Sequence, residues 1–207
     1  MTDTPARMAD HWWWRPGWSQ GTRWYTWHLT FDGADDVHRL AADYRHALAD
    51  VPGLDLVPDP WLHLTMQGLG STAEVSQADA RAIADAAAHH LAKIPAFDLA
   101  LGPAIVTPEA LLLTVDPAEP VHAVRSAIRT AIADIWPEVP EQADGFRPHV
   151  SVAYSNADGP AQPAADALAS VTTYPATARV TAAELIVLGR DRQMYEWETA
   201  ARVELGG

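Results

Sequence analysis

Two copies of a short motif, His-x-Thr/Ser-hydrophobic, are the part of the 207-residue sequence best suited to chemistry. They are His63-Leu64-Thr65-Met66 and His149-Val150-Ser151-Val152. Each lies in a run of β-forming residues, and residues i and i+2 of a strand point to the same face. Each motif therefore predicts an imidazole and a hydroxyl side by side, with the residue between them turned into the core.

Two such pairs facing each other would surround one small anion, which suits the hydrolysis of a cyclic phosphodiester. One imidazole would take a proton from water, and the other would give a proton to the leaving sugar oxygen. The hydroxyls of Thr65 and Ser151 would bond the phosphoryl oxygens. Histidine fits because its ordinary pKa of about 6.5 allows one ring to be neutral while the other is protonated. This chemistry requires no metal and no cofactor, and either His63 or His149 could be the base.

The elements that would position the two motifs recur at an interval of 86 residues. The shift that lays His63 on His149 also lays Thr65 on Ser151 and the helix start at Ser76 on residue 162. Alternation and turn signals predict strands at 24–31, 61–67, 97–101, 111–115, 148–154, 178–188 and 194–205, with a turn at 52–60. Helical periodicity predicts helices at 35–49, 76–93, 120–135 and 163–170. The pattern indicates an α+β chain of two similar lobes that face each other.

Composition excludes several other classes of protein. The chain has no Cys, which rules out disulfides, thiolate nucleophiles and Cys-ligated metal centres. No window reaches the roughly 18 uninterrupted apolar residues of a membrane helix. The net charge of −13 argues against binding to long DNA or RNA, which needs a basic footprint. We expect a cytoplasmic, monomeric protein of one domain.

The sequence resembles the two-histidine (2H) phosphoesterase superfamily, in its 2'-5' RNA ligase and cyclic phosphodiesterase branch. The resemblance rests on the 63–66 motif with Gly68 after it, on residues 146–154, and on the order of elements from about 24 to 205. It implies a bilobal, pseudo-twofold α+β fold spanning 1–207, with antiparallel sheets lining a central cleft and helices outside. It also implies metal-independent chemistry on 2',3'-cyclic phosphates or 2'-5' linkages, of a small nucleotide or a short RNA terminus.

We predict His63, Thr65, His149 and Ser151 as the catalytic residues, and Arg147, Tyr154, His28, Trp27 and Arg23 as substrate-binding residues. Arg147 would share a strand face with His149 if the strand is regular. His28 opens a third match to the motif without a partner at the 86-residue interval, so it either lines the cleft as a polar residue behind the side chains that contact the ligand, or is exposed on the sheet.

The Trp-rich N-terminal segment, residues 1–23, and the strand after it hold six of the nine Trp residues, between positions 12 and 27, with Arg15 and Arg23 and no acid from 11 to 31. Such a patch can stack a base and contact a phosphate, or its rings can cover a sheet or a lobe interface. We favour covering, with one or two rings at the rim of the cleft.

Three other functions compete with hydrolysis. RNA 2'-5' ligation is the same chemistry in reverse, with a 5'-hydroxyl in place of water, and the sequence does not separate the two directions. A non-catalytic module that binds nucleotides or RNA ends is the alternative from a different class. The run Gly17-Trp18-Ser19-Gln20-Gly21 matches a serine-hydrolase nucleophile elbow, but it precedes a strand instead of following one, so a turn is the better interpretation.

Overall fold

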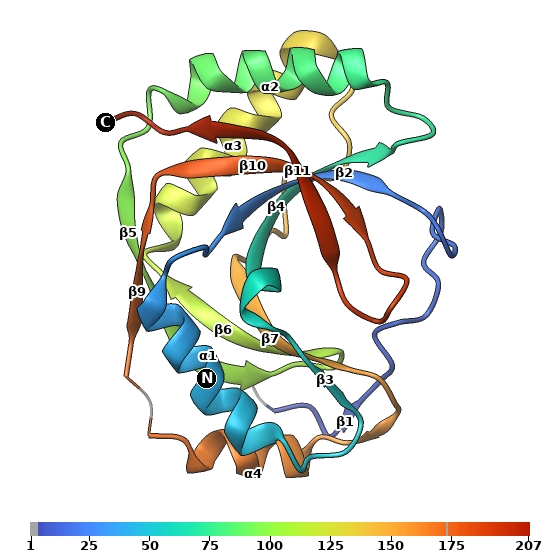
Figure 1. Ribbon diagram of the computed structural model, residues 1–207, viewed down its shortest axis with the longest axis vertical. Helices are drawn as coiled ribbons and strands as arrows, with labels where there is room; N and C mark the ends of the chain where they lie inside the picture. Colours follow the sequence, from blue (N-terminus) through green and yellow to red (C-terminus); the bar gives the residue numbers. More distant parts are fainter. Residues whose placement is uncertain (1–3, 173) are drawn as a thin grey trace.

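The computed structural model describes residues 4–172 and 174–207, whose strands form two antiparallel sheets and one short pair (Figure 1). The four-stranded sheet has the order β11 (Glu196–Glu204), β10 (Ala182–Gly189), β2 (Trp24–Thr30) and β4 (His63–Ser71). The five-stranded sheet has the order β3 (Leu54–Leu56), β7 (His149–Ser155), β6 (Ala110–Asp116), β5 (Phe97–Val106) and β9 (Ala176–Val180). The short pair joins β1 (Arg7–Met8) to β8 (Gly159–Pro160).

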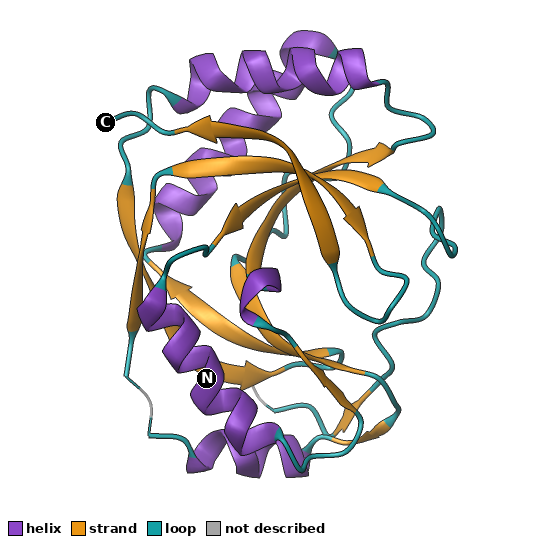
Figure 2. Cartoon of the chain, in the orientation of Figure 1, coloured by secondary structure: helices purple, strands orange, loops and turns teal. Residues whose placement is uncertain are grey.

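The helices lie outside the sheets, two at each end of the molecule (Figures 1 and 2). They are α1 (Asp35–Leu48), α2 (Gln77–Leu91), α3 (Ala118–Ile135) and α4 (Gln162–Ser170). Helix α2 packs on α3 and β11, whereas α1 packs on α4 and β9. The predicted α+β class with antiparallel sheets is confirmed. No helix within the described ranges is both long enough and apolar enough to cross a bilayer.

Local sequence explains where the helices form and which face they bury. Helix α2 begins after Ser76, whose hydroxyl accepts a hydrogen bond from the backbone N–H of Asp79 at 3.0 Å, as the predicted capping pair requires. The apolar stripe predicted for α1 is buried: Val37, Leu40, Ala41, Tyr44 and Leu48. On α3 the predicted stripe is buried except at Ile135, which is the last residue of the helix and is exposed.

Two predicted elements are wrong in their bounds. The single strand expected at 178–188 is two strands, β9 and β10, which break at Thr181 and belong to different sheets. The run expected as one turn at 52–60 contains β3, which pairs with β7, and a 3-10 turn at Asp59–Trp61. That turn takes Trp61 out of the expected strand, so β4 begins at His63.

The two sheets correspond at the interval seen in the sequence. Strands β2 and β6 begin 86 residues apart, at Trp24 and Ala110, and β4 and β7 begin 86 apart, at His63 and His149. Strands β10 and β5 occupy matching places, beside β2 and β6. Strands β4 and β7, which carry the two motifs, contact each other across the sheets. On this correspondence we propose that the chain is one bilobal domain built from two related halves.

Alternation along β4 and β7 places the middle residue of each motif in the core. Leu64 and Val150 are both fully buried, whereas Thr65 and His149 are exposed. The same two strands therefore serve the core with one face and the space between the sheets with the other.

Replacing Leu64 with Ala should lower the free energy of unfolding by about 2–5 kcal/mol, because the substitution leaves a cavity among fully buried neighbours. Urea denaturation monitored by Trp fluorescence measures the change. The matched control is Thr65→Ala on the adjacent, exposed position, which should change stability by much less. Equal losses for the two variants would contradict the assignment of opposite faces.

Candidate active site

The two motif histidines are held by the same hydrogen bond. His63 and His149 are the first residues of their strands, and each ring meets the backbone carbonyl two residues earlier, that of Trp61 and that of Arg147, at 2.8 Å from Nδ1. A carbonyl oxygen only accepts, so Nδ1 carries the proton in both rings. Nε2 of each ring is therefore the nitrogen left to exchange protons with a ligand.

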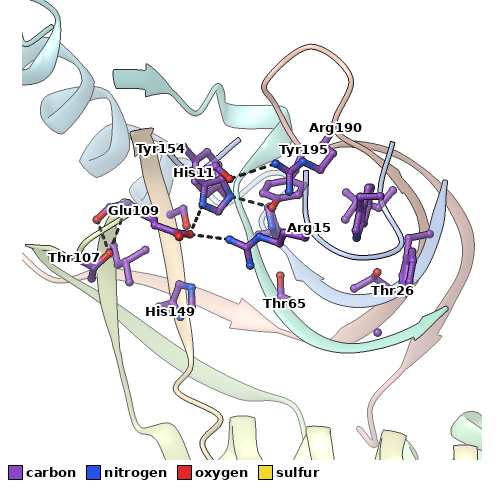
Figure 3. A pocket seen from close by; sticks show the side chains of 18 of the residues that line it. His11, Arg15, Thr26, Thr65, Thr107, Glu109, His149, Tyr154, Arg190 and Tyr195 are labelled. Carbon is purple, nitrogen blue, oxygen red and sulfur yellow. Dashed lines mark hydrogen bonds and ion pairs between the residues drawn. The ribbon is translucent and has the colours of Figure 1, made fainter. Parts of the chain in front are cut away.

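The four predicted catalytic side chains line one cavity of about 550 Å³ between the sheets. Figure 3 shows Thr65 and His149 at this cavity, below a group formed by His11, Arg15, Tyr195 and Arg190. The residues that line it are His11, Arg15, Trp18, Trp24, Thr26, His63, Thr65, Gly68, Thr107, Glu109, Ala110, Leu112, Glu141, His149, Ser151, Tyr154, Leu188, Arg190 and Tyr195.

A β-bulge brings Tyr154 into the same cavity. Strict alternation from His149 and Ser151 would turn Tyr154 to the opposite face of β7. The register against β6 shifts between Leu111 and Leu112: Tyr154 pairs with Ala110, whereas Ser151 pairs with Leu112. Strand β7 thus has one more residue than β6 over this stretch. The extra residue reverses the alternation, which is the usual effect of a bulge. The predicted substrate-binding Tyr154 thus reaches the cavity wall.

Burial distinguishes His63 from His149. His63 is 7 % exposed, and its pKa is lowered to about 4, mainly by this burial; the hydrogen bond to Trp61 opposes the shift and the nearby His149 adds to it. Its ring stacks on His28 at 4.2 Å between centroids and meets Trp197 edge-on at 5.2 Å. His149 is exposed to solvent. The two histidines thus share a hydrogen bond and differ in their surroundings.

His28 lies behind His63, in agreement with the alternative that made it a polar residue behind the cleft lining and not with the exposed one. It is fully buried and does not line the cavity, and it is not exposed on the sheet. Burial and the neighbouring His63 hold its pKa well below the ordinary value, so both stacked rings are neutral near pH 7. Its Nε2 lies 3.5 Å from the hydroxyl of Thr65. His28 therefore supports two cavity residues from the core side.

Three residues predicted to bind substrate lie away from the cavity. Trp27 is fully buried, because it lies on the face of β2 opposite Thr26, which lines the cavity. Arg23 pairs with Asp191 at 2.8 Å and is not part of the cavity wall. Arg147 precedes β7, so strand alternation does not extend to it; its exposed side chain is not in the cavity wall, and its carbonyl holds His149.

The N-terminal segment supplies part of the cavity wall. The favoured interpretation of its Trp residues was that most rings cover the sheet and one or two lie at the rim of the cleft, and the structure agrees with it in part. Trp12 is buried and donates its indole N–H to Asp55 at 2.8 Å, and Trp18 lines the cavity stacked on Trp24 at 5.4 Å. Trp13 and Trp14 are about half exposed, at 51 % and 49 %.

A polar chain that the sequence analysis missed runs from this segment into the cavity. His11 Nδ1 donates to the Glu109 carboxylate at 3.2 Å, which leaves Nε2 to accept from the Tyr195 hydroxyl at 2.9 Å. Arg15 donates to the same carboxylate at 2.7 Å. Burial, with Arg15 next, lowers the pKa of His11 to about 4, so this ring is neutral near pH 7. The one signal in the sequence was that no acidic residue lies between positions 11 and 31, so an acidic partner for His11 or Arg15 had to come from a distant part of the chain.

Glu141 was missed as well. It lies in the left-handed region, at φ 59°, and its carboxylate accepts from the backbone N–H of Gly68 at 3.3 Å. A Cβ on Gly68 would lie 2.6 Å from that oxygen, so a side chain at this position would displace the carboxylate. Arg129 donates to the backbone carbonyl that precedes Glu141, and Arg125 donates to the two carbonyls that follow it. Burial raises the pKa of Glu141.

Several solved structures share the fold of this chain. A Thermus thermophilus protein superposes with a TM-score of 0.67 at 18% identity, covering 89% of this chain and 98% of that one. A structure described as a phosphoesterase gives 0.63 at 19%, covering 90% and 99%. Escherichia coli LigT complexed with 3'-AMP gives 0.63 at 18%, covering 91% and 100%. We find no curated protein with significant sequence similarity to the chain.

The fold and the paired motifs define a phosphoesterase of the two-histidine class, which confirms the resemblance seen in the sequence. The sequence profile of the 2'-5' RNA ligase superfamily matches residues 34–192. The chain belongs to this superfamily. In the described part of the chain, no group of three or more His, Asp or Glu side chains is arranged to hold a metal ion.

We expect the His63 ring to take up a proton only near pH 4, because burial disfavours its charged form. NMR titration of its Cε1–H resonance, assigned by comparison with His63→Asn, measures the pKa. In the unfolded chain His63 titrates near 6.5. The free energy of unfolding should therefore fall as the pH drops from about 6.5 to about 4, and less steeply in His63→Asn. A pKa near 6.5 in the folded protein would contradict this description of the site.

Proposed function

We propose that the protein is a phosphodiesterase that hydrolyses 2',3'-cyclic phosphates or 2'-5' linkages of nucleotides or short RNA ends, without a metal or cofactor. The observation that carries the proposal is a pair of histidines that line one cavity and form matching hydrogen bonds through Nδ1. These bonds leave Nε2 of each ring to exchange protons with a ligand in that cavity. Family membership supports the reaction class.

The unequal burial of the two histidines supports a division of roles. His63 is neutral at neutral pH, since its pKa is about 4, and is thus ready to accept a proton from water. His149 is exposed to solvent in the same cavity, and we assign to it the delivery of a proton to the leaving group. Water oxygen then bonds to phosphorus, the bond from phosphorus to one ribose oxygen breaks, and that oxygen takes the proton from His149.

Hydroxyl groups would bind the phosphoryl oxygens in this reaction. Thr65 and Ser151 lie two residues from the histidines on the same strand faces and line the cavity. Each can donate one hydrogen bond to an oxygen whose negative charge grows in the transition state. Tyr154 is buried in the same wall and is a further candidate donor; burial raises the pKa of its hydroxyl, which therefore stays protonated.

A nucleotide is the ligand that the cavity supports best. Trp18 and Trp24 are aromatic surfaces on its wall on which a base can stack. Structures of LigT are described with 3'-AMP, ATP and NADP+ bound. The net charge of −13 favours a small nucleotide or a short RNA end over long RNA. Ligation of a 5'-hydroxyl to a cyclic phosphate would use the same groups in reverse.

Replacing His63 or His149 with Ala should reduce turnover of a 2',3'-cyclic nucleotide at least ~100-fold, the usual contribution of one positioned acid or base. The double variant should lose much less than the product of the two, since acid and base act together. Thr65→Ala and Ser151→Ala should be milder, as one hydrogen bond to a charged group contributes about 1.5–3 kcal/mol.

His89→Ala is the matched control, because His89 is an exposed residue on α2 and should leave turnover unchanged. If the wild type is no faster than the double variant on a panel of cyclic phosphates and 2'-5' dinucleotides, the protein is a binding module and not an enzyme.

Two further measurements test the mechanism. Turnover should be unchanged by EDTA, since the proposed steps are proton transfers between side chains and substrate. The acid limb of the kcat/KM profile should lie near pH 4, where His63 becomes protonated and can no longer act as the base. Loss of activity in EDTA that added metal restores would replace this mechanism with a metal-assisted one.

A further inference from the structure

Arg190 is a buried cation in the cavity wall. Only 3 % of the residue is exposed, and its Nη2 donates to the backbone carbonyls of His11 at 3.2 Å and Trp13 at 3.1 Å. The neighbouring arginines Arg15 and Arg192 each form an ion pair with a carboxylate. Across residues 4–172 and 174–207, no such ion pair is found for Arg190. The proposed reaction gives it no role.

Four aromatic rings surround this guanidinium. Its Cζ lies 5.3 Å from the ring centroid of Trp12, 5.7 Å from Trp14, and 5.8 Å from both Trp18 and Tyr195. Rings at these distances favour the cation and shield it from water, so they hold it charged in a fixed position. They supply no counter-charge, and a buried charge without one is costly. The cavity is the side from which a counter-charge can come.

The charges around Arg190 leave an excess of positive charge at this end of the cavity. Arg15 is balanced by Glu109. His11, which joins Glu109 to Tyr195, is neutral near pH 7 because its pKa is about 4. Arg190 is thus the charge in excess, and an anion placed here would face both guanidinium groups.

This excess charge lies one side chain away from the motif histidines. The Tyr195 ring is 5.8 Å from the Arg190 guanidinium and 6.1 Å from the His63 ring. Figure 3 shows Arg190 on the side of Tyr195 away from Thr65. A phosphate at Arg190 is therefore a different group from the phosphate between the histidines, and both can belong to one nucleotide.

We propose that Arg190, assisted by Arg15, forms a second phosphate subsite, which binds a phosphate on the 5' side of the ribose whose 2',3'-phosphate reacts. This inference rests on the proposed function, and it defines the substrate class: a cyclic nucleotide that carries a 5'-phosphate, or the terminal cyclic nucleotide of an oligonucleotide. The 5' phosphate is a monoester in the first and a diester in the second.

The test compares kcat/KM for adenosine 2',3'-cyclic phosphate, its 5'-phosphorylated form, and an ApA dinucleotide ending in a 2',3'-cyclic phosphate. The wild type should prefer at least one substrate with a 5' phosphate by ten-fold or more, the effect expected of charge-assisted hydrogen bonds. The choice between the two identifies a monoester or a diester. Arg190→Gln should reduce the preference to less than about two-fold.

Arg192→Gln is the matched control, since it removes the same charge two residues away, at an exposed ion pair with Glu196 outside this cavity. It should retain the preference. A wild type without preference for either phosphorylated substrate overturns the subsite, and so does an Arg192→Gln variant that loses the preference as fully as Arg190→Gln, because long-range charge would then explain it.

A binding measurement separates this proposal from the proposed function. Calorimetric titration of the wild type should give a dissociation constant about ten-fold lower than that of adenosine 3'-phosphate for at least one of two ligands, adenosine 3',5'-bisphosphate (a 5' monoester) or an ApA dinucleotide with a 3'-phosphate (a 5' diester). This result needs no turnover and no variant, so it stands if Arg190→Gln fails to fold. Equal dissociation constants for all three ligands overturn the subsite, whereas tighter binding of a ligand with a 5' phosphate without any cyclic phosphate hydrolysis supports the subsite and overturns the proposed function.

Discussion

The hydrogen bond from each motif histidine to the carbonyl two residues before it is the constraint on which the site depends. It fixes the tautomer, orients the ring at the first residue of the strand, and leaves Nε2 for the ligand. Neither bond needs another side chain, so each half of the molecule builds its own imidazole position from local backbone. The contact of β4 with β7 then brings together two histidines whose tautomer and orientation are already set.

Equal construction does not produce equal histidines. In the four-stranded sheet, His28 on the neighbouring strand stacks on His63 and removes it from water. The position 86 residues further, on β6, is Thr114, and among the residues that the structure describes no aromatic ring stacks on the exposed His149. A difference in the strand beside the motif, and not in the motif itself, therefore separates the proposed base from the proposed acid.

The sequence was sufficient for features that depend on local pattern. Periodicity predicted the four helices, and alternation predicted that Leu64 and Val150 would be buried while the histidines and hydroxyls faced one space. It failed where a single residue changes the alternation or where distant segments meet. The bulge near Tyr154 depends on how β6 pairs with β7, and the break at Thr181 depends on which sheet each strand joins.

The same limit explains which residues of the site were missed. Arg190 was not predicted, and Arg23 and Trp27 lie outside the cavity wall, because their positions depend on the path of the N-terminal segment and the face of β2. Nothing in the order of residues along the chain brings His11 to Glu109, 98 positions away. Such meetings follow from tertiary packing, which one sequence does not encode in a readable pattern.

The cavity wall is built from two separate parts of the chain, the strands that carry the histidines and the N-terminal segment. The groups proposed for bond breaking stand on β4 and β7, inside the range shared with the superfamily, whereas His11, Arg15 and Trp18 precede residue 34, where that range begins. Substitutions in the segment alter the wall that meets the rest of a substrate and leave the strands with the histidines as they are. Selectivity in this protein can therefore diverge along one short stretch of chain, independently of the chemistry.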